Sequence, residues 1–133
     1  MVSKYPVLIR ELHLDTFGHV NNATYLALFE EARWDLVTKN GYGLKQVQQN
    51  KKGPVILEVN LKFMKELKLR EEITITTEMV HYKSKIGQLK QQMLKANGEV
   101  AAEAIFTFGL FDLIERKLID PTPEWKRGIG MEI

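Results

Sequence analysis

The sequence has no cysteine and only three histidines, and both shortages exclude kinds of chemistry. Without cysteine there can be no disulfide framework, no thiolate metal site and no cysteine nucleophile. The histidines, His13, His19 and His81, are scattered along the chain, and this scatter argues against a zinc site built by the protein. We therefore expect neither a bound metal nor a cofactor.

Long apolar runs and a strong net charge are also missing. No run approaches the roughly 18 consecutive apolar residues of a transmembrane helix. The first six residues lack the apolar core of a signal peptide. The formal net charge of +2 is too small to indicate nucleic acid, and exposed aromatic residues interleaved with basic ones are not evident. We expect a cytoplasmic protein that binds neither membranes nor nucleic acid.

What is present is typical of one globular domain. The chain has 133 residues, of which 44% are hydrophobic and 27% are charged. It shows no internal repeat, low-complexity run or linker, so a single domain is predicted over residues 1–133. A chain of this size buries roughly two-thirds of its unfolded surface and can form a core without cross-links.

One long helix is predicted. The apolar residues take a helical period from about Asn22 to Asn40. Asn21 or Asn22 is a suitable N-cap, and Gly41 is a suitable end. A strand over Val7–Leu14, rich in branched side chains, precedes the helix. The apolar stripe of the helix consists of Tyr25, Phe29, Ala32 and Leu36.

The rest of the chain is predicted to be strand. Alternation of apolar and polar residues indicates strands over 53–63, 71–82, 86–96 and 99–112. The turn Lys83-Ser84-Lys85 separates the middle two, and Asn97-Gly98, a type I′ hairpin signal, joins the last two. Residues 121–127 form a short helix or a loop. The expected inward faces are Val55, Leu57, Val59, Leu61 and Phe63 on one strand, and Ala102, Ala104, Phe106, Phe108 and Leu110 on another.

These elements predict an α+β fold. Five long strands and one apolar-faced helix can bury one another only if a five-stranded antiparallel sheet wraps around the long central helix. A cystatin-like sheet on one helix is an alternative. The outer face of the sheet also carries apolar residues, which indicates a homodimer or homotetramer. These outer residues are Ile56, Met64, Val80, Ile105 and Phe111.

The segment from Asp15 to Arg33 carries the candidate chemistry. Asp15 ends the first strand, Gly18 allows a tight turn, and the backbone N–H groups at the start of the helix are free to bind an oxyanion. A carboxylate beside an oxyanion site suits thioester hydrolysis. The alternative is that Asp15 and Asn21 are ordinary turn and capping residues and that His19 is a hydrogen-bonding strut.

This segment resembles a family signature. It reads D-T-F-G-H-V-N-N-A-T-Y-L-x-x-F-E-E-A-R and is similar to that of hotdog-fold acyl-CoA thioesterases of the hydroxybenzoyl-CoA thioesterase-like family. The resemblance implies that Asp15 is the catalytic carboxylate and that the Asn22 N–H polarises the thioester carbonyl. It also implies that Tyr25 and Glu30 line or support the site.

The resemblance is incomplete after the strand predicted over 53–63. The family tends to have a proline and then a Gly-Asp turn there, whereas this chain has Glu66 and Arg70 where proline and glycine are expected. This departure weakens inferences about that loop and about substrate size.

A basic stretch follows. Lys83, Ser84 and Lys85 lie in a segment without acidic residues, and a cationic rim there would favour the phosphates of coenzyme A. The resemblance supports this assignment, because related enzymes tend to meet the nucleotide near this hairpin. The alternative is that these lysines keep an exposed sheet soluble.

The expected function is hydrolysis of a small or medium acyl-CoA to the free acid and coenzyme A, which is part of the substrate and not a cofactor. Asp15 would be the nucleophile or general base, Asn22 would supply the oxyanion donor, and His19 is a further catalytic candidate. Gly18, Tyr25, Glu30 and the Lys83–Lys85 turn would bind substrate. The thiol carrier is either coenzyme A or acyl carrier protein.

Two other functions stay open. One is a non-catalytic module that binds acyl-CoA or acyl carrier protein. The other is a hotdog dehydratase, although the Gly-rich and Pro-rich segment that follows the histidine of such enzymes is absent here.

Overall fold

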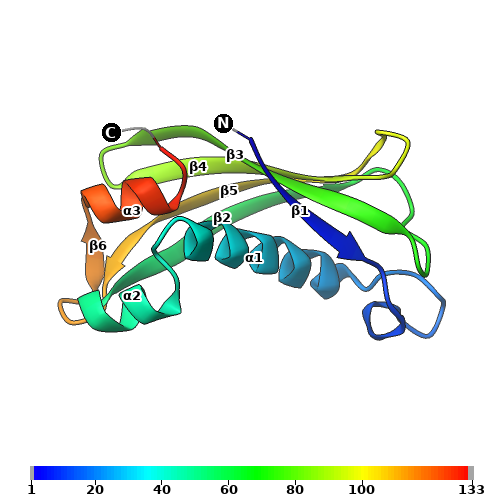
Figure 1. The fold of residues 1–133 in the computed structure, drawn as a ribbon, viewed down its shortest axis with the longest axis horizontal. Coiled ribbons are helices and arrows are strands. Elements are labelled where there is room, and N and C mark those ends of the chain that lie inside the picture. Colours follow the sequence, from blue (N-terminus) through cyan, green and yellow to red (C-terminus); the bar gives the residue numbers. More distant parts are fainter. Residues whose placement is uncertain (1, 132–133) are drawn as a thin grey trace.

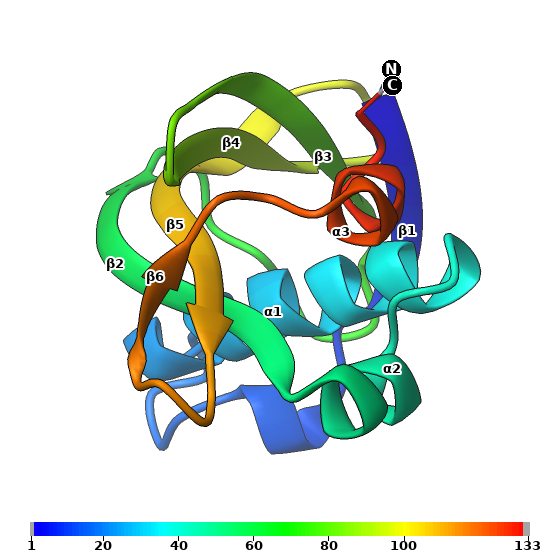
Figure 2. The ribbon, with the colours of Figure 1, turned by 90° about the vertical axis from the view of Figure 1, so that its left-hand side faces the viewer.

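The computed structural model describes residues 2–131 and contains one antiparallel sheet that curves around a long helix (Figures 1 and 2). The strands are β1 (Val2–Leu8), β2 (Lys52–Phe63), β3 (Glu72–Lys83), β4 (Ile86–Leu94), β5 (Val100–Asp112) and β6 (Lys117–Ile119). The helices are α1 (Asn22–Lys39), α2 (Leu44–Asn50) and α3 (Pro123–Gly128), with a 3-10 turn, η1, at Glu11–His13.

The sheet has the predicted architecture. Its order is β1-β3-β4-β5-β2, with the short β6 paired to β5, and all the pairings are antiparallel. In Figure 2 the five long strands arch over α1, with β1 and β2 on either side of it. The prediction of a five-stranded antiparallel sheet around one long helix is confirmed.

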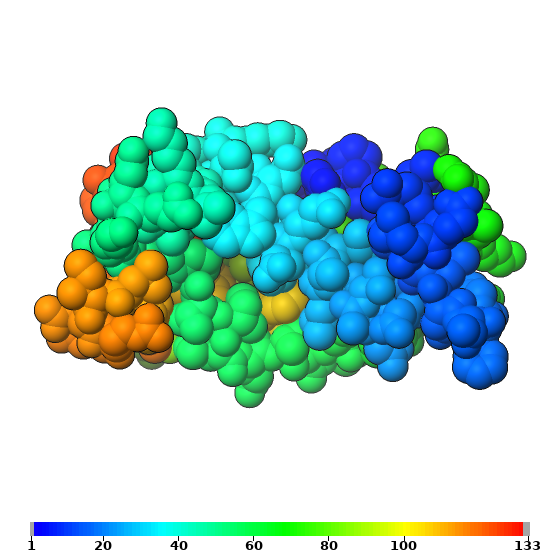
Figure 3. Space-filling view, turned by 90° about the horizontal axis from the view of Figure 1, so that it is seen from below, coloured from blue at the N-terminus to red at the C-terminus, as the bar shows by residue number. Residues whose placement is uncertain are grey.

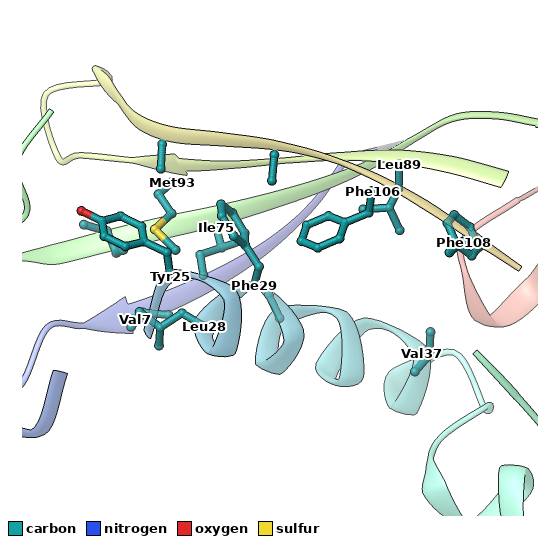
Figure 4. Packing of buried hydrophobic residues seen from close by; sticks show 14 of the residues in the cluster. Val7, Tyr25, Leu28, Phe29, Val37, Ile75, Leu89, Met93, Phe106 and Phe108 are labelled. Carbon is teal, nitrogen blue, oxygen red and sulfur yellow. The ribbon is translucent and has the colours of Figure 1, made fainter. Parts of the chain in front are cut away.

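The helix α1 packs its apolar face against the concave side of the sheet. Phe29 is completely buried, and the edge of its ring meets Phe106 of β5 with 6.0 Å between ring centroids. Figure 4 shows side chains from α1 and from the sheet pointing toward one another. The buried residues of α1 are Tyr25, Leu28, Phe29, Ala32 and Val37, so the predicted stripe is confirmed except for the half-buried Leu36.

The prediction for the first strand is wrong in its bounds. The strand spans Val2–Leu8 and not 7–14, because it pairs only with the first half of β3, from Leu8↔Glu72 to Val2↔Glu78. Ile9 then exchanges backbone hydrogen bonds with Glu71 and Arg70. Beyond Ile9 the chain leaves the sheet and turns through η1.

Two short elements were not predicted. Helix α2 has a mostly polar sequence with only Val47 buried, so it has no apolar stripe that a sequence pattern could reveal. Strand β6 has three residues and depends on pairing with the end of β5. Of the two alternatives for residues 121–127, the short helix is correct, since α3 begins after a capping Thr122.

The β4–β5 hairpin is confirmed, but its turn is not type I′. Such a turn needs positive φ at both central residues, and within this turn only Gly98 has one, at 89°. The Gly98 N–H donates to the Lys95 carbonyl at 2.9 Å, and the Lys95 N–H donates to the Glu99 carbonyl. This pattern matches the three-residue hairpin in which a left-handed glycine follows a turn.

A bulge in β2 overturns part of its predicted face. The register with β5 shifts between Ile56 and Glu58, which leaves Leu57 as the extra residue. Directly paired residues share a face of the sheet, so Ile56, opposite Phe108, lies on the helix side. Ile56 was expected on the outer face, and Val55 and Leu57 on the inner one. Val59, Leu61 and Phe63 face inward as predicted, opposite Phe106, Ala104 and Ala102.

Buried His13 closes the turn that leads into the candidate site. Its Nδ1 accepts the Arg10 N–H at 2.9 Å, and its carbonyl accepts the Asn21 N–H at 3.2 Å. Burial lowers the pKa of His13 from its ordinary 6.5, the Arg10 cation lowers this pKa further, and Glu31 acts in the opposite direction. The neutral imidazole is therefore part of the fold.

Protonation of His13 is expected to weaken the fold. Because the pKa of His13 is lower in the folded protein, its contribution is complete above about pH 6.5 and is lost as the pH falls through the folded pKa. His13→Asn keeps an acceptor but does not titrate. Its free energy of unfolding should fall less between about pH 7.5 and about pH 5.5 than that of the parent, measured by denaturant unfolding.

The control for this experiment is His81→Asn, which changes an exposed histidine on β3. This variant should keep the pH dependence of the parent. Equal slopes for the parent and for His13→Asn would contradict the role of His13.

Candidate active site

The loop between η1 and α1 is pinned by its own backbone. Leu14 forms a bridge with Val20, and the Asp15 N–H donates to the His19 carbonyl at 2.8 Å. The Gly18 N–H donates to the Asp15 carbonyl at 3.1 Å, and the φ of Gly18 is +80°, which favours glycine. The loop therefore has a defined shape, with Gly18 at the position that needs a left-handed backbone.

The Asp15 carboxylate is oriented by this loop. Its Oδ1 accepts the N–H groups of Phe17 at 2.9 Å and of His19 at 3.1 Å. Within residues 2–131, Oδ2 accepts no hydrogen bond and Asp15 forms no ion pair. One oxygen thus fixes the carboxylate, and the other is available to a substrate or a water.

The start of α1 leaves one backbone amide unused. Asn21 caps the helix, because its side chain accepts the Ala23 N–H at 2.8 Å and its carbonyl accepts those of Thr24 and Tyr25. The Asn22 N–H donates to no group in the part of the chain that the structure describes. An unpaired N–H at the positive end of a helix dipole can bind a developing oxyanion.

A hollow lies beside this amide. Tyr25 packs against Phe63 with 4.9 Å between ring centroids, and burial, followed by Glu66 and Glu71, raises the pKa of Tyr25. His19 has a 61% exposed side chain whose Nε2 lies 3.4 Å from Oε1 of Glu66. The residues that line the hollow are His19, Val20, Asn22, Tyr25, Phe63, Met64, Lys65, Glu66 and Leu67.

The structure thus gathers three of the predicted site residues around one hollow: His19, Asn22 and Tyr25. Asp15 and Gly18 lie in the adjoining loop, but neither lines this hollow within one described chain. Within residues 2–131 no hydrogen bond joins the Asp15 carboxylate to Asn22, and Oδ1 of Asp15 accepts the amides of its own loop, so the pairing of this carboxylate with the Asn22 amide across a substrate stays a prediction.

Other predicted site residues lie farther away. Glu30 is eight residues beyond Asn22 along α1, or about 12 Å at the helical rise. The turn Ser84-Lys85 joins β3 and β4 at the opposite end of the molecule from the Asp15 loop, beside α3 (Figure 1). From Thr74 to Lys83, β3 extends by about 30 Å, so one chain does not bring this hairpin to the hollow.

The loop that departs from the family pattern contributes residues that were not predicted to be functional. Glu66 lies at the hollow and faces His19. Arg70, where glycine was expected, has a φ of +67°, and its Nη2 contacts the Glu11 carboxylate at 2.7 Å. The departure itself was the only signal in the sequence for Glu66.

A groove follows α1 farther along the helix. Two hollows on its side toward β2 share Glu30, Arg33 and Ile56, and Figure 3 shows the cleft between α1 and β2 with β5 at its floor. We call these two hollows the α1–β2 groove; neither shares a lining residue with the hollow beside Asn22. From its outer to its inner end, representative facing residues of α1 and β2 are Ala27 and Val59, and Val37 and Pro54.

Two further findings concern residues 2–131. They contain no cluster of three or more His, Asp or Glu side chains that could hold a metal ion. No helix among them has the length and apolar character needed to cross a membrane.

Comparison with known proteins agrees with the geometry. The family described as the thioesterase-like superfamily matches residues 8–129. The long-chain acyl-CoA thioesterase FadM of Escherichia coli strain K12 is 33% identical over 114 residues, which are 85% of this chain and 86% of FadM.

Solved structures agree as well. The crystal structure of YbaW, a probable thioesterase of Escherichia coli, covers 95% of both chains with a TM-score of 0.83 and 29% identity. A Staphylococcus aureus protein solved in complex with CoA has the same fold, with a TM-score of 0.89 and 18% identity over 97% of this chain and 82% of that one. The chain therefore belongs to the thioesterase-like superfamily, has the hotdog fold, and is a thioester hydrolase.

Proposed function

We propose that this protein hydrolyses acyl-CoA thioesters at the N-terminus of α1. The observation that carries the proposal is the unpaired Asn22 N–H, which opens into a hollow beside the Asp15 loop. The names of related proteins support the substrate class, since FadM is a long-chain acyl-CoA thioesterase and a protein of the same fold was solved with CoA.

In the proposed reaction the thioester carbonyl oxygen accepts the Asn22 N–H. Asp15 either activates a water, which adds to the carbonyl carbon, or attacks that carbon itself to form an anhydride that water then hydrolyses. The carbon–sulfur bond breaks, and coenzyme A leaves as a thiol after its sulfur gains a proton. His19 lines the same hollow and is our candidate donor of that proton.

We infer that Asp15 acts on the substrate only when a second copy of the chain completes the site. Within one chain its Oδ1 is held by loop amides and its Oδ2 is available. In the family that the sequence resembles, the site lies between two subunits. We therefore propose that the site forms in a homodimer or homotetramer, in which a second copy closes the open side of the hollow and brings substrate to Asp15.

The edge of the sheet supports this assembly. Strand β2 has twelve residues and pairs only with β5 among the described strands, so its other edge is open. Long open edges tend to be covered. Exposed apolar side chains lie along this edge and just after it: Ile56, Leu57, Val59, Phe63 and Met64.

The α1–β2 groove supports a longer acyl chain than the small or medium group that the sequence favours. It runs from Leu26 past Arg33 to Val37, and it is lined mainly by apolar side chains. We propose that the acyl chain lies in this groove. Because the Lys83–Lys85 hairpin is distant within one chain, it would meet the phosphates of a coenzyme A that is bound at another copy.

Replacing Asn22 by proline removes its backbone N–H, the proposed oxyanion donor. Asn22 is the first residue of α1, a position where proline fits, and Asn21 has the extended backbone (φ −64°, ψ 142°) that a following proline requires. Asn22→Pro should lower kcat about 10²- to 10³-fold, as expected for the loss of one oxyanion donor. Asn22→Ala, which keeps the N–H, should retain most of the activity; equal kcat values for the two variants would contradict the oxyanion role.

Replacing Asp15 by asparagine tests the role of its carboxylate. Asp15→Asn keeps an oxygen that can accept the two loop amides but removes the base or nucleophile, so kcat/KM for acyl-CoA should fall about 10²-fold or more. The matched control is Asp120→Asn, at an exposed aspartate before α3. Parent-like turnover in Asp15→Asn would exclude Asp15 as the catalytic carboxylate.

The proposed assembly can be tested in solution. Light scattering should give the parent a mass of at least twice the 15.4 kDa of one chain. Leu57→Lys places a charge on the open edge, at an exposed residue that lines none of the hollows described above, and should shift the protein toward the monomer and lower its activity. Leu44→Lys, at an exposed position on α2, should change neither. A monomeric, fully active parent would contradict the proposed assembly.

A further inference from the structure

Within residues 2–131, Arg33 is a cation without a carboxylate partner, and it lines the α1–β2 groove. Its Nη1 donates to Oε1 of Gln91 at 3.0 Å, and its Cζ lies 4.2 Å from the centre of the Phe106 ring. None of the ion pairs in residues 2–131 includes Arg33. A guanidinium has five N–H donors, so most of the hydrogen-bonding capacity of Arg33 is unused by the described part of the chain.

The orientation of Arg33 is fixed by the buried side chain of Gln91. Gln91 is fully buried, and its Nε2 donates to the Phe29 carbonyl and to Oγ1 of Thr77, each at 3.0 Å. These two bonds use both amide hydrogens of Gln91 and fix the plane of the amide group. Its Oε1 therefore faces Arg33. The guanidinium is held by this bond and by the Phe106 ring before any ligand binds.

The surroundings of Arg33 are mostly apolar. It lines both hollows of the groove, with Val59 and Phe106 in one and Met79 and Trp125 in the other. Burial lowers the pKa of Arg33 to about 10, and Glu30 acts in the opposite direction. The side chain is therefore protonated at neutral pH. Glu30 lines the same hollows, but its carboxylate is not within ion-pair distance.

A hydrocarbon chain in this groove would displace water from the guanidinium. Leaving the charged donors without partners is costly, so a saturated chain that reaches Arg33 is disfavoured. An oxygen at this depth would accept the unused N–H groups and remove the penalty. The groove thus contains a polar anchoring point within an apolar passage.

The distance of Arg33 from Asn22 indicates where along the acyl chain an oxygen would be bound. Arg33 is eleven residues beyond Asn22, or about 16 Å along α1. An extended chain advances about 1.2 Å per bond, so this distance is about 13 bonds from a carbonyl bound at Asn22. We propose that Arg33 selects acyl groups that bear a carboxylate or hydroxyl oxygen near this position, an inference that rests on the proposed function.

The test compares acyl-CoAs of one length. Substrates are tetradecanoyl-CoA, its analogue with a terminal hydroxyl, its analogue with a terminal carboxylate, and hexanoyl-CoA, which is too short to reach Arg33. The parent should hydrolyse the oxygenated chains with kcat/KM at least about tenfold above that for tetradecanoyl-CoA. Arg33→Met should abolish this preference and leave hexanoyl-CoA hydrolysis within about twofold of the parent value.

Two further variants sharpen the result. Arg33→Lys keeps the charge without the planar donor fork and should retain part of the preference. Lys39→Met, at an exposed cation on the same helix, should retain all of it. A preference for either oxygenated substrate that depends on Arg33 supports the proposal, and the larger of the two preferences tells whether the oxygen is charged or neutral.

Several outcomes would overturn the proposal. One is the absence of an oxygenated preference in the parent, and another is an equal preference in Arg33→Met. A third is a change of assembly mass in Arg33→Met with an unchanged substrate ratio, since the guanidinium would then serve assembly. If no acyl-CoA, including hexanoyl-CoA, were hydrolysed, the proposed function itself would fail, and this inference with it.

Discussion

The hydrogen-bond pattern at the first turn of α1 is the constraint on which the site depends. A helix begins with amides that have no i→i−4 partner, and here Asn21 satisfies two of them, at Ala23 and Thr24, and leaves the one at Asn22. The same short segment holds Asp15 through backbone and loop contacts. The donor and the carboxylate are therefore positioned by local geometry, with His13 as the buried strut that ties the segment to the turn before it.

The packing of α1 also creates the α1–β2 groove, which we propose as the path of the acyl chain. Because α1 is buried along one stripe only, its side toward β2 is left open and the groove forms there. The bulge at Leu57 matters for this groove, since it turns Ile56 toward the helix and into the lining. The buried Gln91 is bonded to the Phe29 carbonyl in the core and orients Arg33 in the groove. One amide side chain therefore connects the core to the groove.

Much of the fold followed from pattern alone. The 3.6-residue period located α1, and strict alternation located β3, β4 and β5, because each of these elements buries one face of regular spacing. Patterns failed where pairing with a distant strand decides the structure. The end of strand β1 is set by its pairing with β3. A bulge in β2 changes which side chains face the helix, and no sequence pattern indicates it.

The candidate site also has a part that the sequence predicts and a part that it does not. The sequence by itself determined which residues lie near the start of α1, because turn, cap and helix lie within eleven consecutive positions, from Asp15 to Tyr25. Only the tertiary structure decided which distant residues join them: Glu66 does so at the hollow, whereas the Lys83–Lys85 hairpin lies at the far end of the sheet. The physical reason is that local hydrogen bonds depend on neighbours along the chain, whereas contacts across a sheet depend on register, which no short sequence segment encodes.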